Sequence, residues 1–238
     1  MKKMLIASTS TVHGKAYLEY MLPELSNFFK GISELLFIPF ARPGGISYDE
    51  YTTIAQKGFE SINIRVKGIH EFDNPKEAVI KSEGIFIGGG NTFELVSQLY
   101  AYDLMSEIRQ AVDSGVRYFG TSAGSNITGV SMKTTNDMPI VYPPSFKTLG
   151  LINFNLNPHY LDPDLNSKHM GETRETRIKE FHQFNEIPVL GLREGSWLEV
   201  EGEQVTLKGN LPARLFLKDK HPVEYQTESD LSFLQLQS

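Results

Sequence analysis

The amino-acid sequence predicts an α/β fold, with a mostly parallel sheet that carries helices on both faces and a C-terminal antiparallel β extension. In the first half, short and almost entirely apolar runs alternate with segments of helical period, which is the pattern of parallel strands buried on both sides. After Trp197, short apolar runs follow one another across turns that contain glycine, which is typical of antiparallel strands.

Apolar runs of strand length define the sheet expected in the first half. They cover residues 4–7, 35–38, 62–66, 84–87 and 116–119. Helical patterns separate them at residues 15–29, 49–59, 92–99 and 104–114. In sheets of this kind, ligands bind beyond the carboxyl ends of the strands, so candidate catalytic residues are sought there.

The second half of the sequence is less regular. Residues 136–158 are rich in proline and asparagine and are expected to be mostly loop, whereas residues 171–184 have helical character. Further strands are expected at residues 189–192, 198–200, 204–207 and 215–217. Because no repeat, low-complexity tract or obvious linker interrupts the chain, we expect one domain over residues 1–238.

Composition argues against several classes of protein. The net charge is −6 and no dense Lys/Arg cluster occurs, which argues against a general nucleic-acid binder. The absence of cysteine removes disulfides, thiolate metal sites and cysteine nucleophiles. No stretch approaches the roughly 20 apolar residues that span a bilayer, and the first apolar run is too short for a signal peptide. We therefore expect a soluble, cytoplasmic protein without a membrane partner.

The segment Gly120-Thr-Ser-Ala-Gly124 fits the G-x-S-x-G pattern of a serine nucleophile, here Ser122. A strand is expected before it, and residues 123–127 can open a helix. Such a tight strand-to-helix turn pushes the serine hydroxyl out above the sheet, and its glycines remove side chains that would collide. The backbone N–H of Ala123 would then face a developing oxyanion. A glycine turn that merely packs closely is the alternative interpretation.

A second glycine turn, residues 88–90, also follows an expected strand and precedes an expected helix. Such a turn can present bare N–H groups to an anion. It lacks the Lys-Ser/Thr pair of a nucleotide P-loop and does not form G-x-G-x-x-G. The interpretation we prefer is the other half of an oxyanion hole, supplied by Gly89 or Gly90; a tight turn that needs positive φ is the alternative.

A serine nucleophile needs a base, usually histidine, and an acid that orients it. The candidate bases are His13, His70, His159, His169, His182 and His221. His159 is favoured because Pro158 fixes the backbone before it, after an apolar stretch. The candidate acids are Asp137, Asp162, Asp164 and Glu194, among which the residues alone do not decide.

Together, these segments resemble peptidase E, the family of aspartyl dipeptidases that remove an N-terminal aspartate from dipeptides. The resemblance runs from Ile6 to about Trp197, in the order of the family. It is carried by residues 37–40, 88–93, 120–126, 134–140, 157–159, 171–174 and 194–197. The sequence departs from the family pattern at residues 42–45, and it is similar only loosely beyond Trp197.

This resemblance implies a Ser-His-Glu triad on a sheet similar to that of the class I glutamine amidotransferases, which are flavodoxin-like. Ser122 matches the nucleophile, His159 the base and Glu194 the orienting acid. Asp137 matches an aspartate that has also been regarded as part of the charge relay. Arg174 matches the arginine that binds the aspartyl side chain of the substrate, a task that suits its planar guanidinium.

The expected enzyme is a serine dipeptidase that acts on Asp-X dipeptides without a metal or organic cofactor, as a monomer or homodimer. The nearest alternative is a cyanophycinase-like peptidase, from a related family that cleaves aspartyl-arginine polymers and shares the serine turn. Residues 135–139 and 171–174 favour the dipeptidase. A catalytically silent small-molecule-binding relative is the other alternative, and the presence of all three triad residues argues against it.

Overall fold

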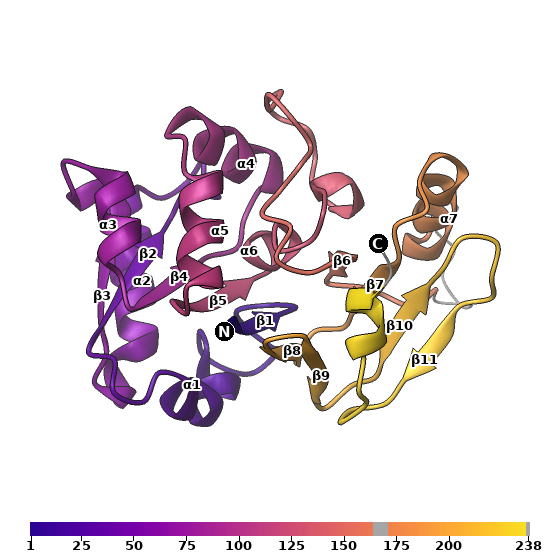
Figure 1. Ribbon diagram of the computed structural model, residues 1–238, viewed down its shortest axis with the longest axis horizontal. Coiled ribbons are helices and arrows are strands. Elements are labelled where there is room, and N and C mark those ends of the chain that lie inside the picture. Colours follow the sequence, from indigo (N-terminus) through magenta and orange to yellow (C-terminus); the bar gives the residue numbers. More distant parts are fainter. Residues whose placement is uncertain (164–170, 237–238) are drawn as a thin grey trace.

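A seven-stranded sheet in the order β3-β2-β4-β5-β1-β8-β9 forms the larger part of the computed structural model, which describes residues 1–163 and 171–236 (Figure 1). Its five parallel strands are β1 (Lys3–Ala7), β2 (Glu34–Ile38), β3 (Arg65–Gly68), β4 (Gly84–Ile87) and β5 (Arg117–Thr121). The antiparallel strands β8 (Ser196–Glu201) and β9 (Gln204–Gly209) extend it beyond β1.

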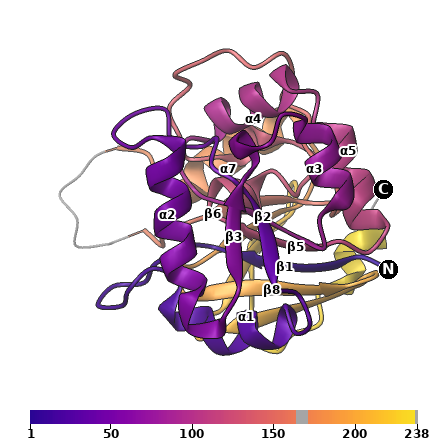
Figure 2. The same ribbon diagram turned by 90° about the vertical axis from the view of Figure 1, so that its left-hand side faces the viewer.

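Alternate side chains of each central strand enter different apolar clusters, one on each face. Leu35 and Phe37 of β2 pack with α1 (Leu22–Phe28) and α2 (Tyr48–Phe59). Leu36 and Ile38 instead join the cluster of α3 (Pro75–Lys81), α4 (Thr92–Ala101) and α5 (Met105–Asp113). Figure 2 shows α2 and the pair α3 and α5 on opposite sides of the strands. Burial of each of these large side chains contributes about 1.5–3 kcal/mol to the stability of the fold. Because helices cover both faces, the expected sheet with helices on both sides is confirmed.

A second sheet of four strands, in the order β11-β10-β7-β6, lies beside α7 (Arg174–Phe184) (Figure 1). Its strands are β6 (Asn155–Pro158), β7 (Val189–Leu192), β10 (Ala213–Phe216) and β11 (Val223–Tyr225). Strands β6 and β7 are parallel, and β10 and β11 add antiparallel pairs. The short segment between β7 and β8, residues 193–195, connects this sheet to the larger one.

Several local expectations were wrong. The helix expected at residues 15–29 begins only at Leu22, because Leu18 takes a left-handed backbone with φ 60° and a 3-10 turn follows. The strand expected at residues 62–66 begins at Arg65, after a 3-10 turn that ends at Asn63 with φ 56°. Strand β6 lies inside the expected loop, and α3 and β11 had no expected counterpart.

Across the described ranges, no helix combines the length and the apolar character that crossing a membrane requires.

Candidate active site

Strands β4, β5 and β1 are neighbours in the large sheet and end at the same edge. β4 runs into the turn of residues 88–90, β5 into Ser122, and β1 into Ser8. Parallel pairing therefore brings segments far apart in the sequence to one place, at the carboxyl ends where such sheets bind ligands.

Ser122 lies in a strained turn between β5 and α6 (Ala123–Asn126), with φ 53° and ψ −110°. A backbone in so sparsely populated a region costs about 1–3 kcal/mol and persists only where neighbours fix it. Here the Ser122 N–H donates to the Ala7 carbonyl at 3.2 Å, and the Ser122 carbonyl accepts from the Asn126 N–H at 2.9 Å. A Cβ at Gly124 would lie 2.2 Å from the Ile87 carbonyl oxygen, so glycine is required for this close approach.

His159 follows β6 and comes to Ser122 from the second sheet. It also has a left-handed backbone, with φ 54°. Its N–H donates to the Ser8 hydroxyl at 2.9 Å, and that hydroxyl donates to the Leu192 carbonyl at 2.7 Å. Ser8 therefore joins the end of β1 to the ends of β6 and β7 and fixes the backbone of His159.

The side chains of Ser122, His159 and Glu194 form a continuous hydrogen-bonded chain. His159 Nε2 lies 2.9 Å from Ser122 Oγ, and His159 Nδ1 lies 2.6 Å from Glu194 Oε1. With the carboxylate accepting from Nδ1–H, Nε2 is left to accept the serine proton, which is the arrangement that activates a serine nucleophile. Glu194 lies in the segment between β7 and β8, so its position depends on both sheets.

The peptide between Gly89 and Gly90 is held in one orientation. The Gly89 carbonyl accepts from the buried Tyr51 hydroxyl at 2.9 Å and from Arg42 Nε at 3.3 Å. Burial raises the pKa of Tyr51, which keeps this hydroxyl protonated as a donor. In a trans peptide the N–H points away from the carbonyl oxygen, so the Gly90 N–H faces away from Tyr51.

Gly90 itself lines the pocket beside Ser122 and Ala123, whereas Gly89 is not among the described lining residues. The φ of Gly90 is 143°, and a Cβ on Gly90 would lie 2.1 Å from the Ala41 carbonyl oxygen. Of the two glycines predicted for an oxyanion hole, we therefore infer that Gly90 supplies the N–H, opposite that of Ala123.

Asp137, predicted together with Glu194 as a catalytic acid, occupies a different part of the pocket. Its Oδ2 accepts from the Thr92 N–H at 2.7 Å, from the Thr92 hydroxyl at 2.6 Å and from the Thr135 hydroxyl at 2.9 Å. Within the described residues, the hydrogen bonds of the His159 ring go to Glu194 and Ser122. Asp137 thus caps the first turn of α4 and does not touch the base.

Arg174 begins α7 and is half-buried at the wall of the pocket. Burial and then the neighbouring Arg177 lower its pKa, and the charge of Asp137 opposes this effect. A guanidinium stays protonated nonetheless, so Arg174 presents a positive charge to the pocket. Within the described residues, no carboxylate oxygen lies within ion-pair distance of it.

The pocket at Ser122 has a volume of about 420 Å³. It is lined by residues from both sheets and the loops between them, namely Arg42, Gly90, Thr92, Ser122, Ala123, Asn126, Thr135, Asn136, Asp137, Pro158, His159 and Arg174. A volume in the lower part of the range of ligand pockets suits a small molecule.

Comparison with known proteins identifies the family. Residues 4–208 match Peptidase family S51. The chain belongs to this family. It is 47% identical to "Peptidase E" of Streptomyces coelicolor over 97% of this chain and 94% of that one. It is 42% identical to "Probable alpha-aspartyl dipeptidase" of Drosophila melanogaster over 98% of this chain and 97% of that one.

A solved structure supports the fold of this S51 peptidase. The crystal structure of a peptidase from an acI-B1 Actinobacterium superposes with a TM-score of 0.72 at 16% identity, covering 98% of this chain and 97% of that one. At this level of identity the likeness concerns the fold.

The other candidate histidines that the structure describes do not line this pocket. His13 and His221 are exposed, His70 pairs with a carboxylate on α2, and the buried His182 bonds to a backbone carbonyl. His169 lies outside the described residues.

Asp162, the remaining candidate acid that the structure describes, does not bond to the base either. Asp162 is exposed and is held by Arg193, whose guanidinium meets it with two hydrogen bonds of 2.7 and 2.9 Å. Asp164 lies outside the described residues. Among residues 1–163 and 171–236, no group of three or more His, Asp or Glu side chains is arranged to hold a metal ion.

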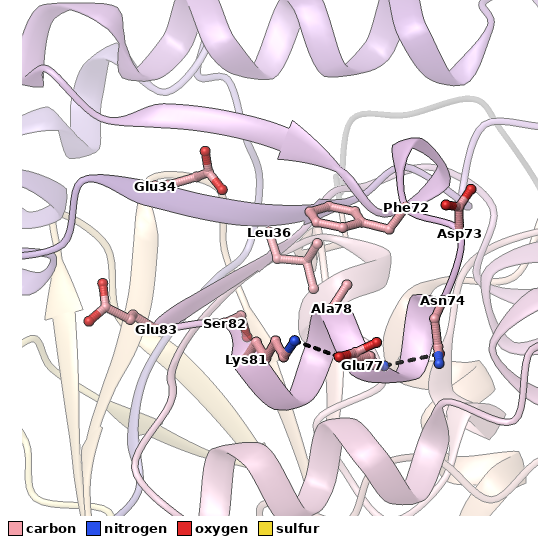
Figure 3. A pocket seen from close by; sticks show the side chains of 10 residues that line it. All are labelled: Glu34, Leu36, Phe72, Asp73, Asn74, Glu77, Ala78, Lys81, Ser82 and Glu83. Atoms are coloured by element: carbon pink, nitrogen blue, oxygen red, sulfur yellow. Dashed lines mark hydrogen bonds and ion pairs between the residues drawn. The ribbon is translucent and has the colours of Figure 1, made fainter.

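A larger hollow of about 620 Å³ lies along α3 and β2, away from the candidate catalytic residues (Figure 3). Several of its polar groups are already paired, since Lys81 lies 2.5 Å from Glu77 and Asn74 accepts from the Glu77 N–H. It is lined by none of the nucleophile or base candidates. The chemistry of this S51 peptidase is therefore to be sought at Ser122.

Sequence reasoning missed the residues that hold the site together. Ser8 stands directly after the first expected strand, at the edge where catalytic groups were sought, and this was a usable signal. Tyr51 is one aromatic residue among several in α2, and nothing local distinguishes it. The role of Arg42 on the Gly89 carbonyl depends on a contact between the loops that follow β2 and β4, and it had no signal beyond its departure from the family pattern.

Proposed function

We propose that this S51 peptidase hydrolyses dipeptides with an N-terminal aspartate in the cytoplasm, through an acyl-enzyme on Ser122. The observation that carries the proposal is the hydrogen-bonded chain of Ser122, His159 and Glu194 beside the charged Arg174. The names of the similar proteins, peptidase E and alpha-aspartyl dipeptidase, support the choice of substrate.

In the first half of the reaction, Ser122 Oγ attacks the aspartyl carbonyl carbon while His159 Nε2 takes the hydroxyl proton. The negative oxygen of the tetrahedral intermediate accepts hydrogen bonds from the N–H groups of Gly90 and Ala123. Loss of one such donor typically costs on the order of 3 kcal/mol of transition-state stabilisation. The C–N bond then breaks, and His159 returns the proton to the leaving amine.

In the second half, water attacks the aspartyl ester of Ser122. His159 takes a proton from the water and delivers it to Ser122 Oγ as the ester bond breaks, which releases free aspartate. Glu194 holds the imidazole in the useful tautomer throughout. Arg174 selects substrates whose first side chain carries a carboxylate, because its planar guanidinium can donate a hydrogen bond to each of the two oxygens.

The test of this function is a panel of Asp-X and X-Leu dipeptides with a chelator present. We expect Asp-Leu to be cleaved and Ala-Leu to be nearly inert, and Arg174→Ala to remove most of this preference. Arg177→Ala, three residues along the same helix, is the matched control. Cleavage of aspartyl-arginine polymers in preference to dipeptides, or a preference that Arg174→Ala leaves unchanged, would contradict the proposal.

A further inference from the structure

Asp137 presents an unused carboxylate oxygen in the pocket. Its Oδ2 is occupied by the hydrogen bonds from Thr92 and Thr135, whereas its Oδ1 accepts none from the residues that the structure describes. Among the described residues that line the pocket, Asp137 is also the one carboxylate. One oxygen thus anchors the side chain, and the other is left for a ligand.

Asn126 supplies a second acceptor in the same pocket. Its side chain is buried, and its Nδ2 donates to the Leu156 carbonyl at 2.9 Å, which fixes the orientation of the amide. Its Oδ1 is buried and has no hydrogen-bond partner within the described chain. A buried acceptor without a donor is costly, and a ligand that donates a hydrogen bond would remove this cost.

The charges of the pocket complement those of an N-terminal aspartate. Arg174 and Asp137 line the same pocket, yet within the described residues no ion pair joins them. The two charges interact across the pocket without a direct contact, so a ligand that carries both charges can lie between them. An aspartate at a free N-terminus carries one carboxylate and one ammonium group a few bonds apart, and Arg174 accounts only for the carboxylate.

We propose that Asp137 and Asn126 bind the α-ammonium group of the substrate, so that the enzyme requires a free N-terminus. This inference rests on the proposed function and assigns Asp137 to substrate binding instead of the charge relay. The ammonium donates one hydrogen bond to Asp137 Oδ1 and another to Asn126 Oδ1. Such charge-assisted bonds are roughly twice as strong as neutral ones.

The experiment is a cycle of two substrates and two proteins. Succinyl-leucine keeps the side-chain carboxylate and the scissile bond of Asp-Leu but lacks the ammonium group. In Asp137→Asn, the amide oxygen can still accept from Thr92 and Thr135, so the cap of α4 is kept while an N–H₂ group faces the ligand. In the wild type, kcat/KM for Asp-Leu should exceed that for succinyl-leucine by about 100-fold. In Asp137→Asn, this ratio should fall below about tenfold.

Two controls accompany the cycle. Glu94→Gln changes a carboxylate in the first turn of α4 that does not line the pocket, and it should leave the wild-type ratio unchanged. Asn126→Ser is measured alongside in case Asp137→Asn fails to fold, and it should also reduce the ratio.

The outcomes separate this inference from the function on which it rests. If the wild type does not cleave Asp-Leu, the proposed function fails. If it cleaves Asp-Leu but the folded Asp137→Asn variant loses activity on both substrates equally, with the wild-type ratio retained, Asp137 is only structural and the inference is overturned. A wild type that cleaves both substrates equally well would overturn it too.

Discussion

The two sheets contribute different parts of the candidate site and hold them in different ways. The large sheet supplies Ser122 and the two N–H groups proposed for the oxyanion hole, from tight turns whose backbones are held by neighbouring segments. The small sheet supplies His159, and the segment that leaves it supplies Glu194. These two side chains are 35% and 48% exposed, so their own packing does not fix them.

The difference shows that the positions of His159 and Glu194 depend on hydrogen bonds that hold the backbone at or next to these residues. We call these contacts anchors. Ser8 holds the backbone of His159, and Arg193, the residue before Glu194, binds Asp162, Glu224 and the Pro212 carbonyl. Each anchor joins segments that are far apart in the sequence. Activity should therefore be sensitive both to the catalytic groups and to the contacts that bring the sheets together.

The largest expected effect tests whether the two regions work as one unit. His159→Ala should lower kcat/KM for Asp-Leu by on the order of 10⁴-fold, because Ser122 loses its base. Combining it with Ser122→Ala should cost little more than either change alone, since each already disables the same step. Steady-state kinetics on the three proteins measures this, and losses that multiply in the double variant would show that the residues act separately.

A smaller effect is expected where the sheets are joined. Ser8→Ala removes an acceptor from the His159 N–H and a donor from the Leu192 carbonyl, so His159 should be held less well. With about 1 kcal/mol for each bond, kcat should fall roughly ten- to thirtyfold with little change in KM. Ser10→Ala, two residues along, is the control. An unchanged kcat in Ser8→Ala would remove Ser8 from this role.

On the side of the large sheet, Tyr51→Phe removes the stronger donor to the Gly89 carbonyl. The Gly90 N–H should then be less well oriented, and kcat should fall by about five- to tenfold, less than for outright loss of an oxyanion donor. Tyr48→Phe, one turn earlier on α2, is the comparison. If Tyr51→Phe raises KM and leaves kcat unchanged, the tyrosine contributes to binding and not to the oxyanion hole.

The smallest effect concerns stability. Arg193 holds the pKa values of Asp162 and Glu224 below their usual range. Their contribution is present above the unfolded-state pKa of about 4 and is lost as the pH falls through the folded-state values. Arg193→Gln should lower the free energy of unfolding by about 1 kcal/mol at pH 7, since both carboxylates are partly exposed. Urea unfolding should show this difference shrinking from pH 5 to pH 3; a constant difference would contradict the assignment.

The same division between the two regions explains what could be predicted from the sequence. The turn at Ser122 is local, so the strand before it, the glycines and the short helix after it mark it clearly. Strand β6 ends at Pro158 within a segment rich in asparagine and proline, and it is a strand because it pairs with β7, more than thirty residues along the chain. No local pattern encodes such a pairing, and the same holds for the contact of Ser8 with His159.

Ser122 is the residue at which the two regions meet, since it follows β5 of the large sheet and contacts His159 of the small one. The decisive measurement is kcat/KM for Asp-Leu in Ser122→Ala, with circular dichroism to show that the fold is kept. Ser114→Ala, at an exposed serine that follows α5 and does not line the pocket, serves as the matched control and should keep turnover. We predict a loss of at least about 10⁴-fold in Ser122→Ala. Turnover within tenfold of the wild type by the folded variant would contradict the serine mechanism.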